Sequence, residues 1–339
     1  MTDRNNTLGA NIPLIYHHAM LLDQQRMDGF REAIELVVPE GGKVLELGGG
    51  SGVLSFFAAQ KAATVYCVER IPASAQSAKK FLDKNKNGNR VQVICADAFE
   101  YLPPEPVDVV ICEMLHVAMV REQQIEVIES FKARYRAKFG DKLPRFIPEA
   151  FIQGIQPIQY SFDFHGYQAH LPVFQPPGQI SAQCIELSSP TLFQVAQYAD
   201  QLPVDIVWLK NITIEKTGTL NAVRFILKNL LAILPKEKRS IDWHNNYLIL
   251  PLAQALNVVA GEKVTISLNY SSGCEIEKLM ESIKAHKVRA HIPLSEQVTQ
   301  VSTSAHYDQN YTTYEITEEQ QSSPKKRSYL PSDLRFFAD

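Results

Sequence analysis

The stretch Lys43-Val44-Leu45-Glu46-Leu47-Gly48-Gly49-Gly50-Ser51-Gly52-Val53-Leu54-Ser55 decides the fold of this chain. Residues 44–47 predict a short β-strand, and residues 53–59 predict the start of a helix. Glycine occupies four of the five positions from 48 to 52, and a turn this rich in glycine can adopt positive φ angles and let a ligand lie against the backbone. The turn also presents unpaired N–H groups at a helix N-terminus, where an anionic group is favoured.

The order of the glycines indicates the type of cofactor. Gly48, Gly50 and Gly52 follow Glu46 in the pattern acidic-x-G-x-G-x-G, whereas the nicotinamide fingerprint places its last two glycines three positions apart. The pattern is similar to that of class I S-adenosylmethionine-dependent methyltransferases, in which these four residues would belong to the cofactor site. The alternative is an ordinary strand–helix turn that happens to be rich in glycine.

The composition is that of an ordinary globular protein with room for two domains. The 339 residues are 45% apolar and 21% charged, and the net charge of −3 gives no reason to expect nucleic acid as a partner. No apolar run reaches membrane-spanning length, and the N-terminus lacks a signal-peptide core, so we expect a cytoplasmic protein with no membrane partner. The five cysteines form no C-x-x-C pair, which favours buried reduced thiols and no metal site.

The N-terminal segment, residues 1–42, predicts a helix that ends at Pro39-Glu40-Gly41-Gly42. Its apolar residues recur at steps of three and four, as on one helix face; they are Met20, Met27, Phe30, Ile34 and Val37. Asp23 and Arg26 are three apart and share a face of this helix. Either they form a surface ion pair, or Arg26 binds a ligand carboxylate through paired hydrogen bonds.

Residues 43–147 alternate strands and helices, which predicts a doubly wound parallel sheet. The expected strands are 43–47, 64–69, 91–97 and 107–113, and the expected helices are 51–60, 73–84 and 121–138. Glu69 ends the second strand about twenty residues after the glycine turn, where a carboxylate can accept both hydroxyls of a ribose; the alternative is a solvated strand end. Asp97 ends the third strand, where it either meets an adenine amino group or caps the next turn.

Two glutamates follow the fourth strand. Glu113 comes at its carboxyl end, beside the expected cofactor site, and Glu122 returns after a loop long enough to fold back. Two carboxylates facing one pocket repel each other unless a cation joins them, and a planar guanidinium suits this role because it forms paired hydrogen bonds. The alternative is that Glu122 only opens the next helix, where an acidic side chain suits the helix dipole.

Together these residues resemble the protein arginine methyltransferase family. The resemblance covers residues 16–54, Glu69 and 113–122, and more weakly the second half. The pattern His17-x-x-Met20-Leu21-x-Asp23-x-x-Arg26 is similar to the family's cofactor-covering helix. This implies that Met20 packs on S-adenosylmethionine and that Arg26 holds its carboxylate. Glu113 and Glu122 are nine residues apart, as in the family's two-glutamate hairpin, which implies that they are catalytic.

The chain departs from the family pattern at several positions. The family's paired tyrosines would fall near Thr7 and Asn11, and Met114 stands where the family has a tryptophan after the first glutamate. The family's Thr-His-Trp loop is similar to residues 241–243 here, although the histidine, His244, stands one place beyond Trp243.

The resemblance also implies roles near that loop. Trp243 would line the substrate pocket, although packing in the core is an equal alternative. Asp23 is the implied proton acceptor, and His244 is a substitute for the loop histidine that pairs with it. Asp242, at the histidine's own place in the loop, would repel Asp23.

Residues 148–294 predict an antiparallel domain that closes as a barrel or a sandwich, and the resemblance implies a β-barrel. Its expected strands are 151–158, 206–215, 221–227, 246–252 and 263–269. Residues 162–177 are either a plain surface loop or, as the resemblance implies, an arm that mediates homodimerisation. Residues 295–339 are polar and predict a poorly ordered tail.

The sequence therefore predicts a Rossmann-like methyltransferase sheet followed by an all-β barrel-like domain. The predicted activity, similar to that of the protein arginine methyltransferases, is methyl transfer to a guanidino nitrogen held by Glu113 and Glu122. One alternative is methylation of free arginine or another small nitrogen nucleophile. An alternative of another class is a catalytically silent dimeric scaffold that binds S-adenosylmethionine.

Overall fold

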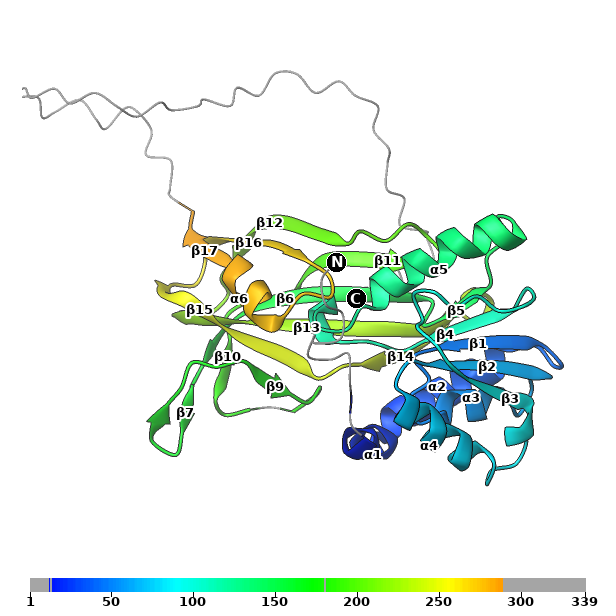
Figure 1. Cartoon of the computed structure of the whole chain (residues 1–339). Coiled ribbons are helices and arrows are strands. Elements are labelled where there is room, and N and C mark those ends of the chain that lie inside the picture. The colour runs from blue at the N-terminus through cyan, green and yellow to red at the C-terminus, as the bar shows by residue number, and fades with distance from the viewer. Residues whose placement is uncertain (1–11, 13, 180, 289–339) are drawn as a thin grey trace, which may run out of the picture. The chain divides into compact units, whose positions relative to one another are not determined.

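The computed structural model describes residues 12, 14–179 and 181–288, which belong to one compact unit (Figure 1). Its first half alternates strands and helices, as expected. In chain order the elements of this half are α1 (Leu14–Leu22), α2 (Gln24–Val37), β1 (Lys43–Leu47), α3 (Val53–Ala58), β2 (Thr64–Glu69), α4 (Pro72–Leu82), η1 (Gly88–Arg90), β3 (Val91–Cys95), β4 (Val109–Cys112), η2 (Val117–Met119), α5 (Gln124–Phe139) and β5 (Arg145–Ile147).

The five strands of this half form one parallel sheet in the order β3-β2-β1-β4-β5. In this sheet Leu47 of β1 pairs with Val68 on one side and with Cys112 on the other, so the carboxyl ends of β1, β2 and β4 lie side by side. The strands β1 and β4 are buried almost throughout, as expected for a parallel sheet that is covered on both faces. Because ligands of such sheets bind beyond the carboxyl ends of the strands, Glu69 and Glu113 lie at the edge where a site is expected.

The second half is built of antiparallel strands, which Figure 1 shows in green to orange. Its elements are β6 (Ala150–Tyr160), β7 (Asp163–Phe164), β8 (Tyr167–Gln168), β9 (Val173–Gln175), β10 (Cys184–Glu186), β11 (Thr191–Gln197), β12 (Asp205–Thr213), β13 (Gly218–Leu234), η3 (Pro235–Glu237), β14 (Arg239–His244), β15 (Tyr247–Val258), β16 (Lys263–Ser271), α6 (Ile276–Ser282) and β17 (Lys284–Lys287).

The long strand β13 organises this half, since it pairs with β6, β14 and β15 in a seven-stranded sheet. The strands β12, β16 and β17 form a second sheet, and β7 and β8 form a small hairpin. The predicted order of a Rossmann-like parallel sheet followed by an antiparallel region is confirmed. Closure of the antiparallel strands into a barrel stays a prediction.

Helix α2 connects the two halves. Its Phe30 is fully buried and packs on Trp243 of β14, with 6.1 Å between the ring centroids. A side chain at Gly29 would lie 3.1 Å from Leu231 of β13, so glycine there lets the helix approach the strand closely. Buried residues of both halves belong to one core. The predicted boundary between residues 147 and 148 falls between β5 and β6.

The structure differs from the sequence-based predictions at three places. The single helix expected before Pro39 is two helices, because Asp23 is extended and its side chain caps α2 by accepting the N–H of Arg26. Trp243 and His244 lie in a strand, β14, rather than in a loop. Cys95, expected to be buried, is exposed at the end of edge strand β3.

Some predictions fall on parts of the chain outside the described residues. These are the positions Thr7 and Asn11 and the polar tail, 295–339. Within the described ranges, no helix is both long enough and apolar enough to pass through a membrane.

Candidate active site

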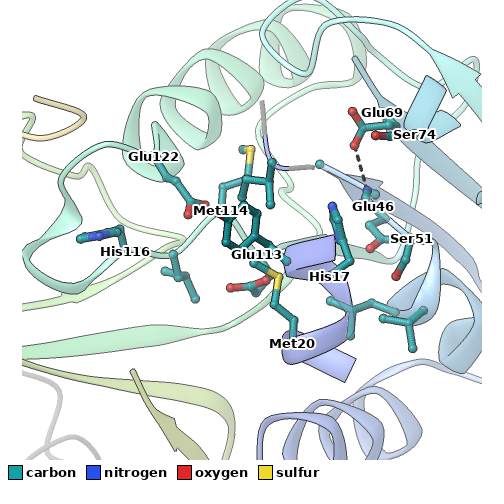
Figure 2. A pocket seen from close by; sticks show the side chains of 18 of the residues that line it. His17, Met20, Glu46, Ser51, Glu69, Ser74, Glu113, Met114, His116 and Glu122 are labelled. Atoms are coloured by element: carbon teal, nitrogen blue, oxygen red, sulfur yellow. Dashed lines mark hydrogen bonds between the residues drawn. The ribbon is translucent and has the colours of Figure 1, made fainter. Parts of the chain in front are cut away.

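A cavity of about 1090 Å³ lies at the carboxyl ends of β1, β2 and β4. This volume slightly exceeds the usual range for a site that holds one small molecule. Figure 2 shows Glu113 and Glu122 directed into it from the connection after β4, with His17 and Met20 approaching from α1. Of the site residues predicted from the sequence, all except Gly52 and His244 line this cavity.

The glycine turn between β1 and α3 forms one wall of the cavity. Gly48 and Gly50 have φ angles of 79° and 52°, which other residues rarely adopt. A Cβ atom at Gly48 would lie 2.9 Å from Met114, and one at Gly50 would lie 2.7 Å from His17. The positive φ angles therefore favour glycine at both positions, and a side chain at either would also displace Met114 or His17. The turn leaves its backbone open toward the cavity.

Glu69 is held firmly at the end of β2. One carboxylate oxygen accepts the N–H of Gly50 at 2.9 Å, and the other accepts the N–H of Ile71 at 2.7 Å. Each oxygen has a second lone pair that can accept a ligand hydroxyl. Asp97 lines the same cavity, and it also caps a turn by accepting the N–H of Phe99 at 2.8 Å. The two alternatives for Asp97 are thus compatible.

Glu46 is almost fully buried in β1 and accepts the hydroxyl of Ser55 in α3. Burial raises the pKa of this carboxyl from its usual 4.5 to about 7, although the bond from Ser55 opposes the change. This contact ties the strand before the glycine turn to the helix after it. Glu46 therefore supports the shape of the turn.

Arg26 is buried on α2 and forms an ion pair with Glu113. The surface ion pair with Asp23 considered from the sequence is not formed, because the Asp23 side chain caps α2 instead. The Arg26 guanidinium also lies over the ring of Trp243, 5.5 Å from its centroid. Its Nε–H is buried and has no hydrogen-bond partner among the described residues, so one donor remains for a ligand.

Glu113 and Glu122 both face the cavity in a poorly solvated environment. Burial raises the pKa of Glu113, and the attraction of Arg26 opposes this only in part. Burial and the charge of Glu113 raise the pKa of Glu122 to about 8. A pair of carboxyl groups in this state gains most from a bound cation, which would favour their charged forms.

The hairpin between the two glutamates has a strained backbone. Ala118, Met119 and Arg121 have φ angles of 61°, 52° and 64°, in the left-handed region that costs L-residues energy. Each of the three makes one hydrogen bond of 2.7–2.9 Å with residues 270–274, at the end of β16 and just after it. The antiparallel half therefore fixes the conformation of the hairpin. Strain that the surroundings impose in this way is typical of functional sites.

Gln124, the first residue of α5, was not singled out from the sequence. It is fully buried, accepts the N–H of Met114 at 2.8 Å and donates to the carbonyl of Cys112 at 2.7 Å. These two bonds hold the backbone on both sides of Glu113. The sequence offered one signal for this role: Gln124 is a polar residue at the start of α5, next to apolar residues of the buried face of that helix.

The antiparallel half contributes further residues to the cavity. Trp243 lines it while packing on Phe30, so packing in the core and a place in the cavity are compatible. The His244 ring is not among the groups that line the cavity. Its Nε2 lies 3.9 Å from the carboxylate of Asp242, and that carboxylate pairs with Nζ of Lys228 at 3.3 Å. Sequence reasoning also missed several lining residues that have no common motif. Among them are Phe174 and Asn245 of the antiparallel half, and His116 and Arg121 of the connection after β4.

Comparisons with known proteins identify the type of domain and the fold. A family model described as a methyltransferase domain matches residues 44–136. An uncharacterised protein of Methanothermobacter thermautotrophicus is 30% identical over 273 residues, which cover 79% of this chain and 97% of that protein. Protein arginine N-methyltransferase 6 of Xenopus laevis is 30% identical over 131 residues, 38% of each chain.

A solved structure has the same fold over most of the chain. It is the Trypanosoma brucei PRMT1 enzyme–prozyme complex with AdoHcy, with a TM-score of 0.62 and 14% identity, and it covers 81% of this chain and 98% of that one. The chain belongs to the family of the Methanothermobacter protein, and it is a divergent class I, S-adenosylmethionine-dependent methyltransferase with the fold of the protein arginine methyltransferases.

Proposed function

We propose that this protein transfers a methyl group from S-adenosylmethionine to a guanidino nitrogen held by Glu113 and Glu122. The observation that carries the proposal is that two half-buried carboxyl groups, both with raised pKa, face the same cavity as the glycine turn. A guanidinium is planar, stays charged at every relevant pH and can bind two carboxylates through separate N–H groups.

The residues around the cavity fit the cofactor. Its adenosine would lie against the glycine turn, with the ribose hydroxyls donating to Glu69 and the adenine near Asp97. The methionine part would lie under Met20, and its carboxylate would accept the Arg26 Nε–H that has no partner among the described residues. When bound, S-adenosylmethionine supplies a methyl group activated by a positively charged sulfur.

The two glutamates position and polarise the substrate. Glu113 and Glu122 bind N–H groups of the guanidinium and draw its positive charge toward the nitrogens that they hold. The remaining nitrogen keeps more of its electron pair, bonds to the methyl carbon as the carbon–sulfur bond breaks, and then loses a proton. Most of the rate comes from alignment of the reacting atoms, and the carboxylates also stabilise the charge in the transition state.

Asp23 is the proposed acceptor of that proton. It lines the cavity one turn before Arg26, and its carboxylate is held in place by the N–H of Arg26 at 2.9 Å. His244 does not line the cavity, so it has no direct role in the proposed reaction.

The proposal is tested by incubating the protein with methyl-labelled S-adenosylmethionine and one of three acceptors: a histone-type peptide, free arginine or a cell lysate. We expect label in a guanidine-containing product. Label in products without a guanidino group would contradict the choice of substrate. Retained cofactor with no labelled product would favour a silent scaffold instead.

A further inference from the structure

The cavity contains a charged side chain, that of Arg121, that the proposed reaction does not use. Arg121, the residue before Glu122, lines the cavity. Among the described residues, its guanidinium makes no hydrogen bond and has no carboxylate oxygen within 4.0 Å. Arg26 differs, since it is already paired with Glu113. Arg121 thus offers a cation to whatever occupies the cavity.

The backbone of Arg121 adopts an energetically unfavourable conformation. Its φ angle is 64°, in the left-handed region, and its N–H donates to the carbonyl of Cys274 at 2.7 Å. An arginine gains nothing from this conformation that a glycine would not provide more easily. A strained residue with an unpaired charge inside a binding cavity is a candidate for ligand recognition.

The charge of Arg121 also has a consequence for the substrate. This charge partly opposes the rise in the pKa of Glu122 that burial and Glu113 cause. It also adds to burial, the main cause, in lowering the pKa of His116. A substrate that brought only a guanidinium to Glu122 would be repelled by this neighbouring cation. A substrate that also carried a negative group could satisfy Glu122 and Arg121 together, and a carboxylate matches the guanidinium fork.

We propose that Arg121 binds a carboxylate of the substrate, and that the substrate is a small guanidino acid such as free arginine. The inference rests on the proposed function. Arg121 and Glu122 are neighbours in the chain and line the same cavity, so one small molecule that carries both a guanidinium and a carboxylate can reach both side chains. An arginine inside a protein chain has no such group, because its carboxyl is part of a peptide bond.

The test compares guanidine acceptors that have the substrate carboxylate with acceptors that lack it. With wild-type protein and labelled S-adenosylmethionine, we expect kcat/KM for arginine to exceed that for argininamide and for agmatine by about 10- to 100-fold, the usual effect of one charge-assisted hydrogen bond. This comparison needs no variant, so it does not depend on the folding of one.

The variant Arg121→Gln tests whether Arg121 causes the preference for arginine over argininamide. We expect it to lower kcat/KM for arginine by a similar factor and to leave the affinity for S-adenosylhomocysteine unchanged. The value of kcat/KM for argininamide should not fall and should rise modestly, because the cation that repels its guanidinium is removed. Arg121→Lys should restore part of the preference, and Arg136→Gln, at an exposed position of α5, is the matched control.

The outcomes separate this inference from the proposed function. Equal rates with arginine and argininamide, or a preference for a peptide, would overturn the role of Arg121 and leave guanidine methylation intact. Weaker binding of S-adenosylhomocysteine to Arg121→Gln would assign Arg121 to the cofactor and also overturn the inference. Methylation of none of the guanidines would contradict the proposed function itself.

Discussion

The guanidinium of Arg26 forms an ion pair with the carboxylate of Glu113, across 87 residues of sequence. Arg26 belongs to the helix proposed to cover the cofactor, and Glu113 belongs to the hairpin proposed to hold the substrate. The pair therefore joins the two halves of the proposed reaction. It also orients Arg26, whose Nε–H has no partner within the described part of the chain and is the donor proposed for the cofactor carboxylate.

Replacement of Arg26 by methionine should weaken cofactor binding in a ligand-dependent way. We expect the Kd of S-adenosylhomocysteine to rise by about 10- to 100-fold, because a charged hydrogen bond to its carboxylate is lost. The Kd of methylthioadenosine, which has no carboxylate, should change by less than about threefold. Isothermal titration calorimetry with both ligands measures this.

The matched control is Arg31→Met, on the exposed face of the same helix. It should leave both affinities unchanged. An equal loss of affinity for the two ligands in Arg26→Met would mean that Arg26 acts through Glu113 and the packing on Trp243, rather than on the cofactor carboxylate.

Replacement of Gln124 by leucine should slow the reaction without weakening the binding of the cofactor. The change removes both hydrogen bonds that fix the backbone around Glu113, and small misplacements of a catalytic group can lower the rate about 100-fold. We expect a large fall in kcat by steady-state assay and an unchanged Kd for S-adenosylhomocysteine. Gln76→Leu, at an exposed position of α4, is the control, and an unchanged kcat in Gln124→Leu would rule out a positioning role for Gln124.

The activity should depend on pH through Glu122. Its pKa is raised to about 8, so at neutral pH most of the free protein carries the neutral acid, which cannot pair with a guanidinium. The quantity kcat/KM reports groups of the free enzyme. We expect it to rise about tenfold between pH 7 and pH 9 and then to level off. A flat profile over this range would contradict the raised pKa of Glu122.

Glu46 should make stability depend on pH in a defined direction. Its pKa in the folded protein, about 7, is higher than the 4.5 of the unfolded chain, so the folded state holds the proton more tightly. The resulting stabilisation is complete below pH 4.5 and is lost as the pH rises through 7.

In the variant Glu46→Gln the side chain at position 46 cannot lose a proton, so this loss of stability with rising pH should not occur. The variant's free energy of unfolding relative to wild type should therefore increase by about 2–3 kcal/mol between pH 5 and pH 8. Urea denaturation at the two pH values measures this, with Glu277→Gln at an exposed site as the control. A difference that is the same at both pH values would show that Glu46 is not held as a buried acid.

The sequence predicted the parallel half well because its signals are local. Apolar runs gave the strands near Glu46, Glu69 and Glu113, and the glycine turn follows directly from residue type. The break between α1 and α2 was missed because Asp23 offers a cap, which competes with helix continuation and is not visible in apolar periodicity.

The contacts that complete the site could not be predicted in the same way. The pairing of Arg26 with Glu113 is a tertiary contact, and nothing in the local sequence of either residue encodes it. Ala118 and Arg121 adopt left-handed backbone conformations although neither residue is a glycine, so residue type did not indicate them. Hydrogen bonds with residues 270–274, in the other half of the chain, hold these conformations. Sequence patterns located the parts of the site, and the packing of the two halves determined how they combine.

The most direct test of the central claim is the variant Glu122→Gln, assayed for labelled-methyl transfer to a guanidine and for binding of S-adenosylhomocysteine. The side chain keeps its size and loses the negative charge that would hold the substrate cation. We predict that turnover falls below detection while the Kd for S-adenosylhomocysteine stays within about threefold of wild type. Methyl transfer at a rate near that of wild type would contradict the two-glutamate account.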